Sequence, residues 1–327
     1  MIRLSRFFRI LPAASLLLAA CGSPLPQTTS PPLPPSPSQD LPSPTQTLLP
    51  VPTPGRTPTG TPVPCDPGSV DYCVETGDFI LQRPIVPPGN DAIDRNYPYG
   101  STEGGSREVH HGVEFENLSG TPVLAAAEGT VYYAGNDATR RFSPWAGFYG
   151  NIIVIEHSFP NALISKLYTL YAHLSKIEVH TGQVVQAGEA IGEVGMTGTA
   201  SGNHLHFELR VTPDDYYSTL DPELWLLPSS GNGTLAILAT DPGGANVFPS
   251  FRIQYFPDRD KPATAAYMAD GYGLETVNPR DPWKEVAAIG DQPAGWYRIT
   301  FLWDYVPFTK WVEIQSGMLT RVKFVVK

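Results

Sequence analysis

Short apolar runs separated by Gly, Pro and Asn constrain the fold of this chain more than any other feature. Such runs, rich in Val, Ile, Thr and Tyr, occupy residues 121–125, 129–134, 151–157 and 167–171, and this composition favours strands over helices. No stretch between 76 and 228 combines an apolar period of 3.6 residues with helix caps. The sequence therefore predicts an all-β region over 76–228, folded as a compact sandwich or barrel-like core.

The last part of the chain alternates apolar and polar residues more regularly, for example at 235–238, 251–255 and 296–301. Alternation with a period of two is typical of strands that bury one face. We therefore predict a separate antiparallel β-sandwich over 232–327, beginning after the loop 228–233.

The closing segment of this predicted sandwich carries a turn signal and several aromatic residues. Ser316-Gly317 separates two apolar runs, so residues 310–326 are predicted to form a hairpin. Four tryptophans could be exposed and stack on sugars, which would make the module a glycan binder or adhesin with the preceding β-region as its scaffold. Packing inside a small sandwich core is the simpler interpretation. These residues are Trp283, Trp296, Trp303 and Trp311.

The beginning of the chain has the pattern of an export signal. Three arginines precede an apolar run over 10–20 that is too short to span a bilayer. The small residues before Cys21 resemble a bacterial lipobox, and this resemblance implies that residues 1–20 are removed and that Cys21 is acylated. Ordinary cleavage beside an incidental cysteine is the alternative. A lipid anchor at Cys21 would hold the protein on the outer face of a membrane in the cell envelope.

Proline is concentrated in one segment. Residues 22–64 contain fifteen of the 35 prolines, and Asp40 and Arg56 are the only charged residues there. Such a composition cannot bury a core, so residues 21–64 are predicted to form an extended, partly polyproline II tether. At about 3.1 Å per residue, this tether could reach on the order of 100 Å from the lipid into the cell wall.

The net charge and the cysteines narrow the functional classes further. A net charge of -10 and a pI of about 5.1 argue against a nucleic-acid partner. An even pair of cysteines in an exported protein predicts a disulfide between Cys65 and Cys73. This disulfide would staple the start of the folded region, and no histidine lies near enough in the sequence to favour a metal role.

Two histidine elements make chemical sense together. Alternate residues of a strand share a face, so a strand here places His204 and His206 on one side. By the same reasoning, a strand places His110 and Glu114 on one face. Two imidazoles and a carboxylate are the ligand set of a catalytic zinc site with an open position. His173 lies between the two elements in the sequence.

The other three histidines and one carboxylate are assigned differently. His111 has the wrong strand parity to join the candidate ligands. His157 ends an apolar strand and is predicted to be structural or to support a ligand, and His180, before a Thr-Gly turn, is predicted to be solvated. Glu208 shares the parity of the downstream histidine pair. Two roles for it stay open: orienting a ligand imidazole, or a position at the surface or core edge.

Ordered motifs around these histidines resemble one family. The pattern His-x-Gly-Val-acid at 110–114 is followed by several glycine-containing motifs and finally by the strand with the histidine pair. This succession is similar to the lysostaphin-type (LytM) zinc metallopeptidases of bacterial cell walls and covers about 105–211. The resemblance implies a compact antiparallel β-sheet peptidase domain, which we place at 65–228. The intervening motifs are Gly120-Thr121-Pro122-Val123, Gly129-Thr130-Val131, Tyr149-Gly150-Asn151, Tyr171-Ala172-His173-Leu174, Gly182-Gln183-Val184-Val185 and Gly195-Met196-Thr197-Gly198.

The resemblance also implies a role for each candidate site residue. His110 and His206 match zinc ligands, and Glu114 stands where the family has a ligand aspartate. His173 and His204 match two histidines that serve the reaction without binding zinc. One of them, His204 in our assignment, would take a proton from the attacking water. The other would stabilise the oxyanion or protonate the leaving amine.

Together these inferences predict a zinc-dependent endopeptidase that hydrolyses peptide bonds in peptidoglycan stem peptides or cross-bridges. Glu114 departs from the family's aspartate, but it can still serve as a ligand, because a carboxylate with one more methylene still reaches a metal. The longer side chain bears on the efficiency of turnover. Some relatives of the family have lost ligands and activate other wall hydrolases. The alternative is therefore a non-catalytic envelope lipoprotein that regulates such hydrolases or binds the cell wall.

Overall fold

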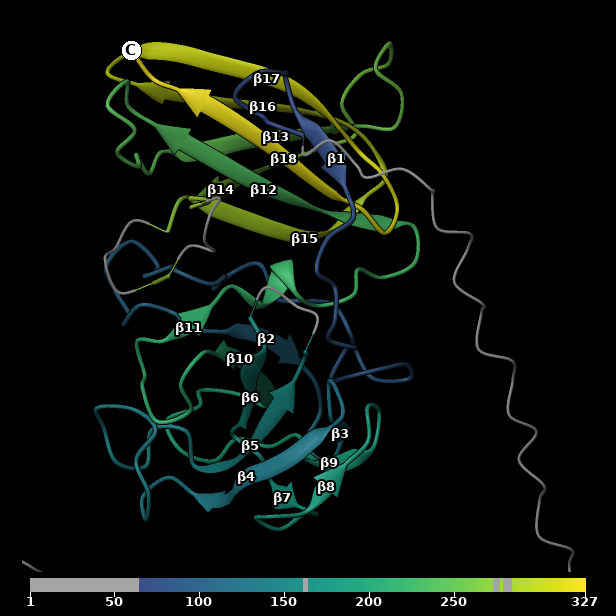
Figure 1. Ribbon diagram of the computed structural model, residues 1–327, viewed down its shortest axis with the longest axis vertical. Helices are drawn as coiled ribbons and strands as arrows, with labels where there is room; N and C mark the ends of the chain where they lie inside the picture. The colour runs from purple at the N-terminus through teal and green to yellow at the C-terminus, as the bar shows by residue number, and fades with distance from the viewer. Residues whose placement is uncertain (1–64, 161–163, 273–276, 279–283) are drawn as a thin grey trace, which may run out of the picture. The chain divides into compact units, whose positions relative to one another are not determined.

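The computed structural model describes residues 65–160, 164–272, 277–278 and 284–327 (Figure 1). The expected signal segment, Cys21 and the tether lie outside these residues. The regular secondary structure of the described chain is almost entirely β-strand, which confirms the predicted fold class, and its helical content is the short 3-10 turn η1 (Pro222–Leu224). Within the described ranges, no helix is both long and apolar enough to cross a membrane.

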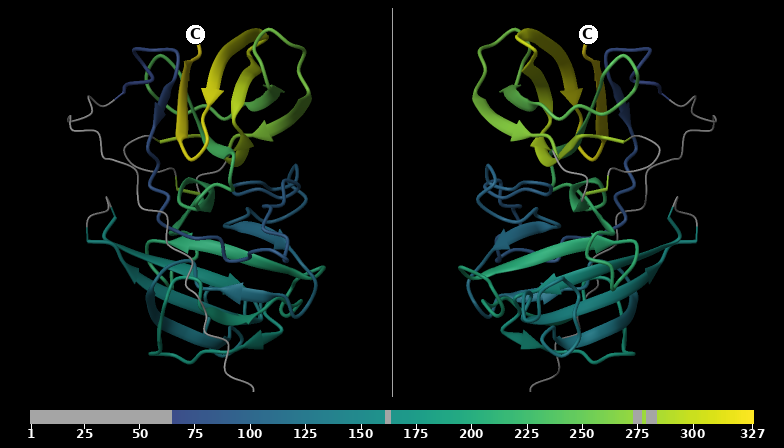
Figure 2. Two further views of the ribbon diagram at one scale, coloured as in Figure 1. Left: turned by 90° about the vertical axis from the view of Figure 1, so that its right-hand side faces the viewer. Right: turned by 90° about the vertical axis from the view of Figure 1, so that its left-hand side faces the viewer.

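The first lobe is built from short strands that coincide with the apolar runs of the sequence. They are β2 (Val113–Glu116), β3 (Pro122–Leu124), β4 (Gly129–Asn136), β5 (Asn151–Ser158), β6 (Lys166–Ala172), β7 (Lys176–Ile177), β8 (Val184–Val185), β9 (Ala190–Glu193), β10 (His204–Arg210) and β11 (Thr219–Leu220). The larger sheet of this lobe has the order β11-β10-β6-β5-β4-β8, and β2 also pairs with β10. Figure 2 shows its long strands side by side. A smaller sheet has the order β3-β9-β7.

The larger sheet is buried on both faces, which explains why its central strands are continuous apolar runs rather than alternating ones. Ile153 of β5 packs into the main core of the lobe, whereas its neighbour Ile152 packs into a second cluster on the opposite face. In β10, Phe207 belongs to the main core. Strand alternation therefore directs His206 to the opposite face, where the candidate site lies.

The C-terminal lobe is a β-sandwich of two four-stranded sheets. Its strands are β1 (Cys73–Glu75), β12 (Asn232–Thr240), β13 (Ser250–Phe256), β14 (Ala265–Asp270), β15 (Ala287–Pro293), β16 (Gly295–Trp303), β17 (Val306–Ile314) and β18 (Leu319–Val325). One sheet has the order β1-β18-β12-β15 and the other has the order β14-β13-β16-β17. Apolar side chains from both sheets form its core. Pairing is antiparallel except between β12 and β18, which run parallel.

The predicted hairpin over 310–326 is wrong. β17 pairs with β16, whereas β18 lies between β1 and β12 in the other sheet. A turn signal fixes where the chain reverses, but it does not fix whether the two strands pair in one sheet or cross to opposite sheets. Here they cross, and Val312 of β17 and Phe324 of β18 both belong to the core between the sheets.

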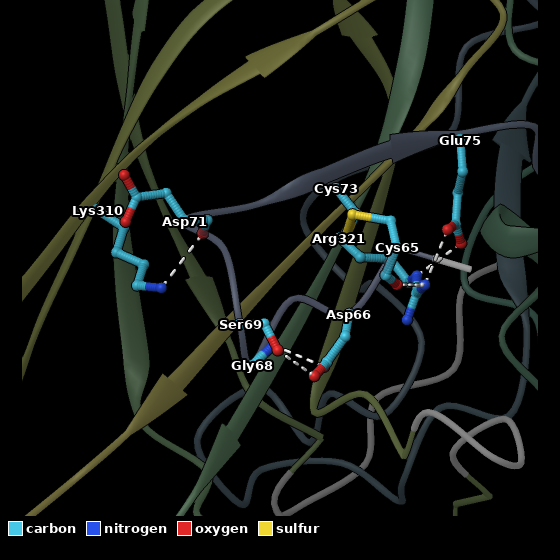
Figure 3. Close-up of a disulfide and its surroundings, with 9 residues drawn as sticks. All are labelled: Cys65, Asp66, Gly68, Ser69, Asp71, Cys73, Glu75, Lys310 and Arg321. Carbon is cyan, nitrogen blue, oxygen red and sulfur yellow. Dashed lines mark hydrogen bonds and ion pairs between the residues drawn. A yellow bond between two sulfur atoms is a disulfide. The ribbon is translucent and has the colours of Figure 1, made fainter. Parts of the chain in front are cut away.

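A disulfide joins Cys65 and Cys73 at the start of the described chain (Figure 3). β1 begins at Cys73 and pairs with β18. This segment, which the sequence assigns to the first lobe, therefore forms an edge of the C-terminal sandwich. Arg321 reinforces the edge, because its guanidinium donates to both carboxylate oxygens of Glu75 and to the carbonyl oxygen of Cys65.

The two lobes share a buried contact. Ala236 of β12 and Ala288 of β15 belong to the main core of the first lobe rather than to the core of the sandwich. Beside them, Arg95 donates to the buried carboxylate of Glu223 and to the carbonyl oxygen of Gly290. The first lobe thus packs against part of the face of the β1-β18-β12-β15 sheet that points away from the sandwich core.

Candidate metal centre

Three side chains from two distant parts of the chain converge on one point. His110 Nε2 lies 2.9 Å from Glu114 Oε1 and 3.2 Å from His206 Nδ1. His206 Nδ1 lies 3.0 Å from the same carboxylate oxygen. Each residue offers one ligand atom, and these atoms all lie within 4.8 Å of one another. The structure therefore brings together the three residues that the sequence assigns as ligands.

The backbone reaches this arrangement partly by a different route from the predicted one. Glu114 lies directly opposite His206 in the antiparallel pair β2–β10, so strand register brings these two together. His110 lies in the loop before β2, so the expected shared strand face does not explain its position. Gly112 lets this loop pass over β10, because a Cβ there would lie 2.5 Å from the carbonyl oxygen of Phe207.

A second carboxylate sets the protonation of His206. Glu208 is fully buried, and its Oε1 lies 2.9 Å from His206 Nε2. Because a carboxylate accepts, Nε2 carries the hydrogen, and Nδ1 of the neutral ring directs its lone pair toward His110 and Glu114. Burial opposes a further proton on His206, but Glu114 and Glu208 raise its pKa to about 10. The surroundings of Nδ1 therefore favour a cation there, either a proton or a metal ion.

An orphaned oxygen also fits a metal ion at this point. Glu114 Oε2 is buried and forms no hydrogen bond with the described residues, although His204 Nε2 lies 3.2 Å away. Buried carboxylate oxygens are rarely left without a partner. Two imidazole nitrogens and a carboxylate oxygen are common zinc ligands. The donor set and its unsatisfied oxygen therefore fit zinc.

Glu208 is held in turn by Arg210, which has no exposed surface. Arg210 Nε donates to Glu208 Oε2 at 2.6 Å, and Nη2 donates to the Tyr149 hydroxyl at 2.9 Å. Nη1 donates to the backbone carbonyls of Phe142 and Pro213. Burial disfavours a charged Glu208, but Arg210 and the neighbouring imidazole hold the pKa of this carboxyl well below its usual range. This bonding fixes the carboxylate, and the carboxylate fixes the ring that donates to it.

Two further imidazoles face the converging atoms. His173 follows β6 in the left-handed backbone region, at φ 62°, and its Nδ1 lies 2.8 Å from the Thr197 carbonyl oxygen. His204 opens β10, and its Nδ1 lies 3.0 Å from the Gly202 carbonyl oxygen. In both rings Nδ1 therefore donates, which leaves Nε2 free to accept a proton. Burial, followed by the neighbouring histidines, lowers the pKa of His173 to about 4.

A cavity of about 330 Å³ opens onto these groups. One of its walls is Tyr97, which stacks on His110 with ring centroids 4.1 Å apart and planes inclined by 12°. The guanidinium carbon of Arg107 lies 4.9 Å from the centroid of Tyr97. The stack holds the His110 ring in its plane. Sequence reasoning missed Tyr97, and no pattern in the sequence signals its role.

None of the other three histidines joins the three converging ligands. His111 is buried, and its Nδ1 lies 2.9 Å from the Thr219 hydroxyl. His157 is buried between a backbone carbonyl and the Thr169 hydroxyl. His180 is exposed. These positions agree with the roles that the sequence assigns to them.

The structure also separates the two roles left open for Glu208. Its hydrogen bond to His206 favours the orienting role, and its complete burial excludes a surface position. Sequence reasoning missed Arg210. A signal was present, because residues 204, 206, 208 and 210 share one face of β10 and all four are polar.

Comparison with known proteins identifies a family for this region. Residues 108–220 match Peptidase family M23. The DD-carboxypeptidase/endopeptidase Mpg of Neisseria meningitidis serogroup B (strain ATCC 13091 / M2091) is 38% identical over 103 residues, covering 32% of this chain and 20% of that protein. The uncharacterized lipoprotein YgeR of Escherichia coli (strain K12) is 35% identical over 135 residues, covering 41% and 44%. The murein hydrolase activator NlpD of the same organism is 37% identical over 112 residues, covering 34% and 24%.

Each of these relatives is similar to less than half of this chain. The chain spans less than half of the length of each of them. The matched segment includes β2 to β11 and contains all five candidate site residues. Residues 108–220 are therefore a peptidase M23 domain of the LytM type, as the ordered motifs indicate.

Proposed function

We propose that this protein is a zinc-dependent endopeptidase that cuts peptide bonds in peptidoglycan stem peptides or cross-bridges. The observation that carries the proposal is the convergence of His110, Glu114 and His206, with His173 and His204 beside them. The M23 domain and a relative named DD-carboxypeptidase/endopeptidase support a peptide substrate from the cell wall.

His110 Nε2, His206 Nδ1 and a carboxylate oxygen of Glu114 would hold the zinc ion. When bound, zinc would act as a Lewis acid that acidifies a water molecule and polarises the scissile carbonyl. Tyr97 and Glu208 keep the two ligand rings in orientation, one by stacking and the other by a hydrogen bond. The chain thus supplies both the ligands and the groups that position them.

The two remaining imidazoles carry protons in this mechanism. Because Nδ1 of each ring donates to a carbonyl, Nε2 is the atom that accepts. His204 would take the proton of the attacking water. His173 would protonate the leaving amine after its Nε2 takes up a proton, because a pKa lowered to about 4 leaves the resting ring neutral near pH 7.

The same proposal includes attachment to a membrane. Residues 1–20 would direct export, Cys21 would carry the lipid, and residues 21–64 would tether the folded lobes to the outer face of that membrane. The lipobox-like residues and a relative named as a lipoprotein support this arrangement. The variant Cys21→Ser should leave the membrane fraction, and its retention there would refute the anchor.

Digestion of defined muropeptides tests the catalytic part. The full chain should release peptide fragments, a chelator should stop the reaction, and added zinc should restore it. His206→Ala should lose both zinc and hydrolysis. His180→Ala, which changes an exposed histidine outside the site, is the matched control. Hydrolysis by His206→Ala at the wild-type rate would overturn the mechanism.

The alternative function is regulation of other wall hydrolases, and a relative named murein hydrolase activator supports it. The metal content of the purified protein separates the two. An enzyme should hold about one zinc per chain, whereas a regulator that lacks a metal site should hold none and should cut no muropeptide. The complete set of candidate ligands favours the enzyme.

A further inference from the structure

The outer face of one sheet in the C-terminal sandwich carries aromatic side chains that the core does not use. Trp296 of β16 and Trp311 of β17 alternate with residues that fill the core, so their side chains point away from it. Both remain partly exposed. Trp303 packs against the core, and Trp283 lies outside the described residues. Core filling, the simpler interpretation from the sequence, therefore does not hold for Trp296 and Trp311.

Basic side chains lie over these two indoles. The guanidinium carbon of Arg259 lies 4.9 Å from the ring centroid of Trp296 and 5.4 Å from that of Trp311. Arg298 lies on the same face of β16, and its guanidinium carbon is 5.6 Å from the Trp311 centroid. Phe256, from the adjacent strand β13, completes the stack at 4.7 Å from Trp311. Aromatic and cationic groups thus alternate across the outer face of the sheet.

The face is hollowed where these groups meet. A cavity of about 300 Å³ is lined mainly by Asp71, Tyr72, Arg259, Trp296, Lys310 and Trp311. We call these six residues the tryptophan pocket. They offer flat apolar rings, two cations and one carboxylate, which is the mixture of an apolar wall with a few polar groups that small-molecule sites use.

The disulfide loop holds one wall of the tryptophan pocket in place. Tyr72 directly precedes Cys73, and its ring meets Trp296 edge to face with centroids 6.5 Å apart. Lys310 Nζ donates to the backbone carbonyl of Asp71 at 3.2 Å, as Figure 3 shows. The disulfide and the pairing of β1 with β18 fix the same segment. The wall is therefore ordered before any ligand arrives, which reduces the entropy cost of binding.

The N–H donors of Arg259 are not used within the described part of the chain. Its side chain is exposed, and it forms no hydrogen bond or ion pair with the described residues. A guanidinium with free donors binds a carboxylate through two parallel hydrogen bonds. Asp71 lines the pocket and Glu313 acts on its wall Tyr72, so Arg259 is the group through which the pocket would favour an anionic ligand.

We propose that the tryptophan pocket binds a saccharide that carries a carboxylate, of the kind found in cell-wall glycan. Arg259, which is exposed, would leave the indole faces, and the apolar face of the sugar ring would stack on the faces of Trp296 and Trp311 that it vacates. The sugar carboxylate would pair with Arg259, and Asp71 would accept from a ring hydroxyl. This site is distinct from the metal centre and does not depend on zinc or on hydrolysis.

Binding to two soluble sugars tests the proposal on the full chain. The acidic probe is the disaccharide N-acetylglucosaminyl-N-acetylmuramic acid, whose lactyl group bears a free carboxylate. The neutral probe is N,N′-diacetylchitobiose, called chitobiose below, which has similar rings, no carboxylate and no free amine. Calorimetry or quenching of tryptophan fluorescence reports the affinity. We expect the intact protein to bind the acidic disaccharide at least about tenfold more tightly, the factor that one charge-assisted hydrogen bond supplies.

Variants assign the two parts of the interaction. Trp311→Ala should weaken both sugars, whereas Arg259→Gln should remove the preference for the acidic sugar and leave chitobiose unchanged. Tyr305→Ala is the matched control, because Tyr305 is a 96% exposed aromatic residue at the turn between β16 and β17, away from the pocket. Arg259 is exposed, so its substitution tests the pocket even if a tryptophan variant fails to fold. No binding of either sugar, equal affinity for both, or unchanged affinities in Arg259→Gln would overturn the proposal.

Discussion

Replacing Glu114 by aspartate tests how the proposed zinc site depends on the length of the side chain that carries the carboxylate. The glutamate already brings Oε1 to 2.9 Å from His110 Nε2 and to 3.0 Å from His206 Nδ1. Aspartate has one C–C bond less, or about 1.5 Å. With β2 fixed against β10, the oxygen would retreat by on the order of 1 Å, and displacements of that size cost about 100-fold in turnover. We therefore expect Glu114→Asp to lower kcat/KM by about 100-fold, although the resemblance places an aspartate at this position in the family.

The assay is cleavage of a defined muropeptide, together with zinc affinity measured by competition with a chelator. Glu116→Asp is the matched control, because it makes the same chemical change two residues along the same strand at an exposed position. The control should keep full activity and zinc affinity. If Glu114→Asp cleaves as fast as the natural chain, the length of the carboxylate arm does not set the geometry of the site, and the reasoning fails.

Three other changes have expected outcomes. Glu208→Gln leaves a buried arginine without its charged partner, so the free energy of unfolding should fall by about 3–5 kcal/mol. The same change should lower zinc affinity by about 10–100-fold. Unchanged zinc affinity in chelator competition would exclude the orienting role. Burial lowers the pKa of His157, so the unfolded chain takes up this proton first, and the free energy of unfolding should fall as the pH drops below about 6.5. His157→Asn should flatten that part of the dependence in denaturant titrations, and an identical slope would count against it. Replacing Cys65 and Cys73 by serine opens a loop with a sequence separation of 8, which should cost about 2–3 kcal/mol in the same titration; an unchanged midpoint would contradict this estimate.

Much of the site follows from the alternation of side-chain direction along the single strand β10. Once residues 204–210 form a strand, His206 must lie on one face and Phe207 on the other, and the uncharged residues 168–172 of β6 pair with β10 beside both. The ordered motifs add the upstream ligands, which periodicity alone cannot pair with β10. Glu114 meets His206 through cross-strand register, a relation between segments that no local pattern encodes.

Three features could not be predicted for definite physical reasons. His110 reaches the site from a loop, where side-chain direction has no period. β1 crosses to the C-terminal sheet, and short strands pair wherever an edge is available rather than with their neighbours in sequence. The turn at 315–318 reverses the chain, but the choice between a hairpin and a crossing depends on which apolar faces must meet in the core, and that is decided by the whole sandwich.

The polar face of β10 shows why a short pattern was not enough to find Arg210. A strand that places four polar side chains on one buried face would be unstable alone, because buried charges without partners cost several kcal/mol each. The cover comes from elsewhere in the chain: Tyr149 and the carbonyls of Phe142 and Pro213 satisfy Arg210. Because these groups hold Arg210 in place, Arg210 can keep the buried Glu208 charged. The charged Glu208 in turn holds the proton of His206 on Nε2, which leaves Nδ1 for a metal. The ligand geometry of the strand therefore depends on loops about sixty residues upstream and three residues downstream of Arg210.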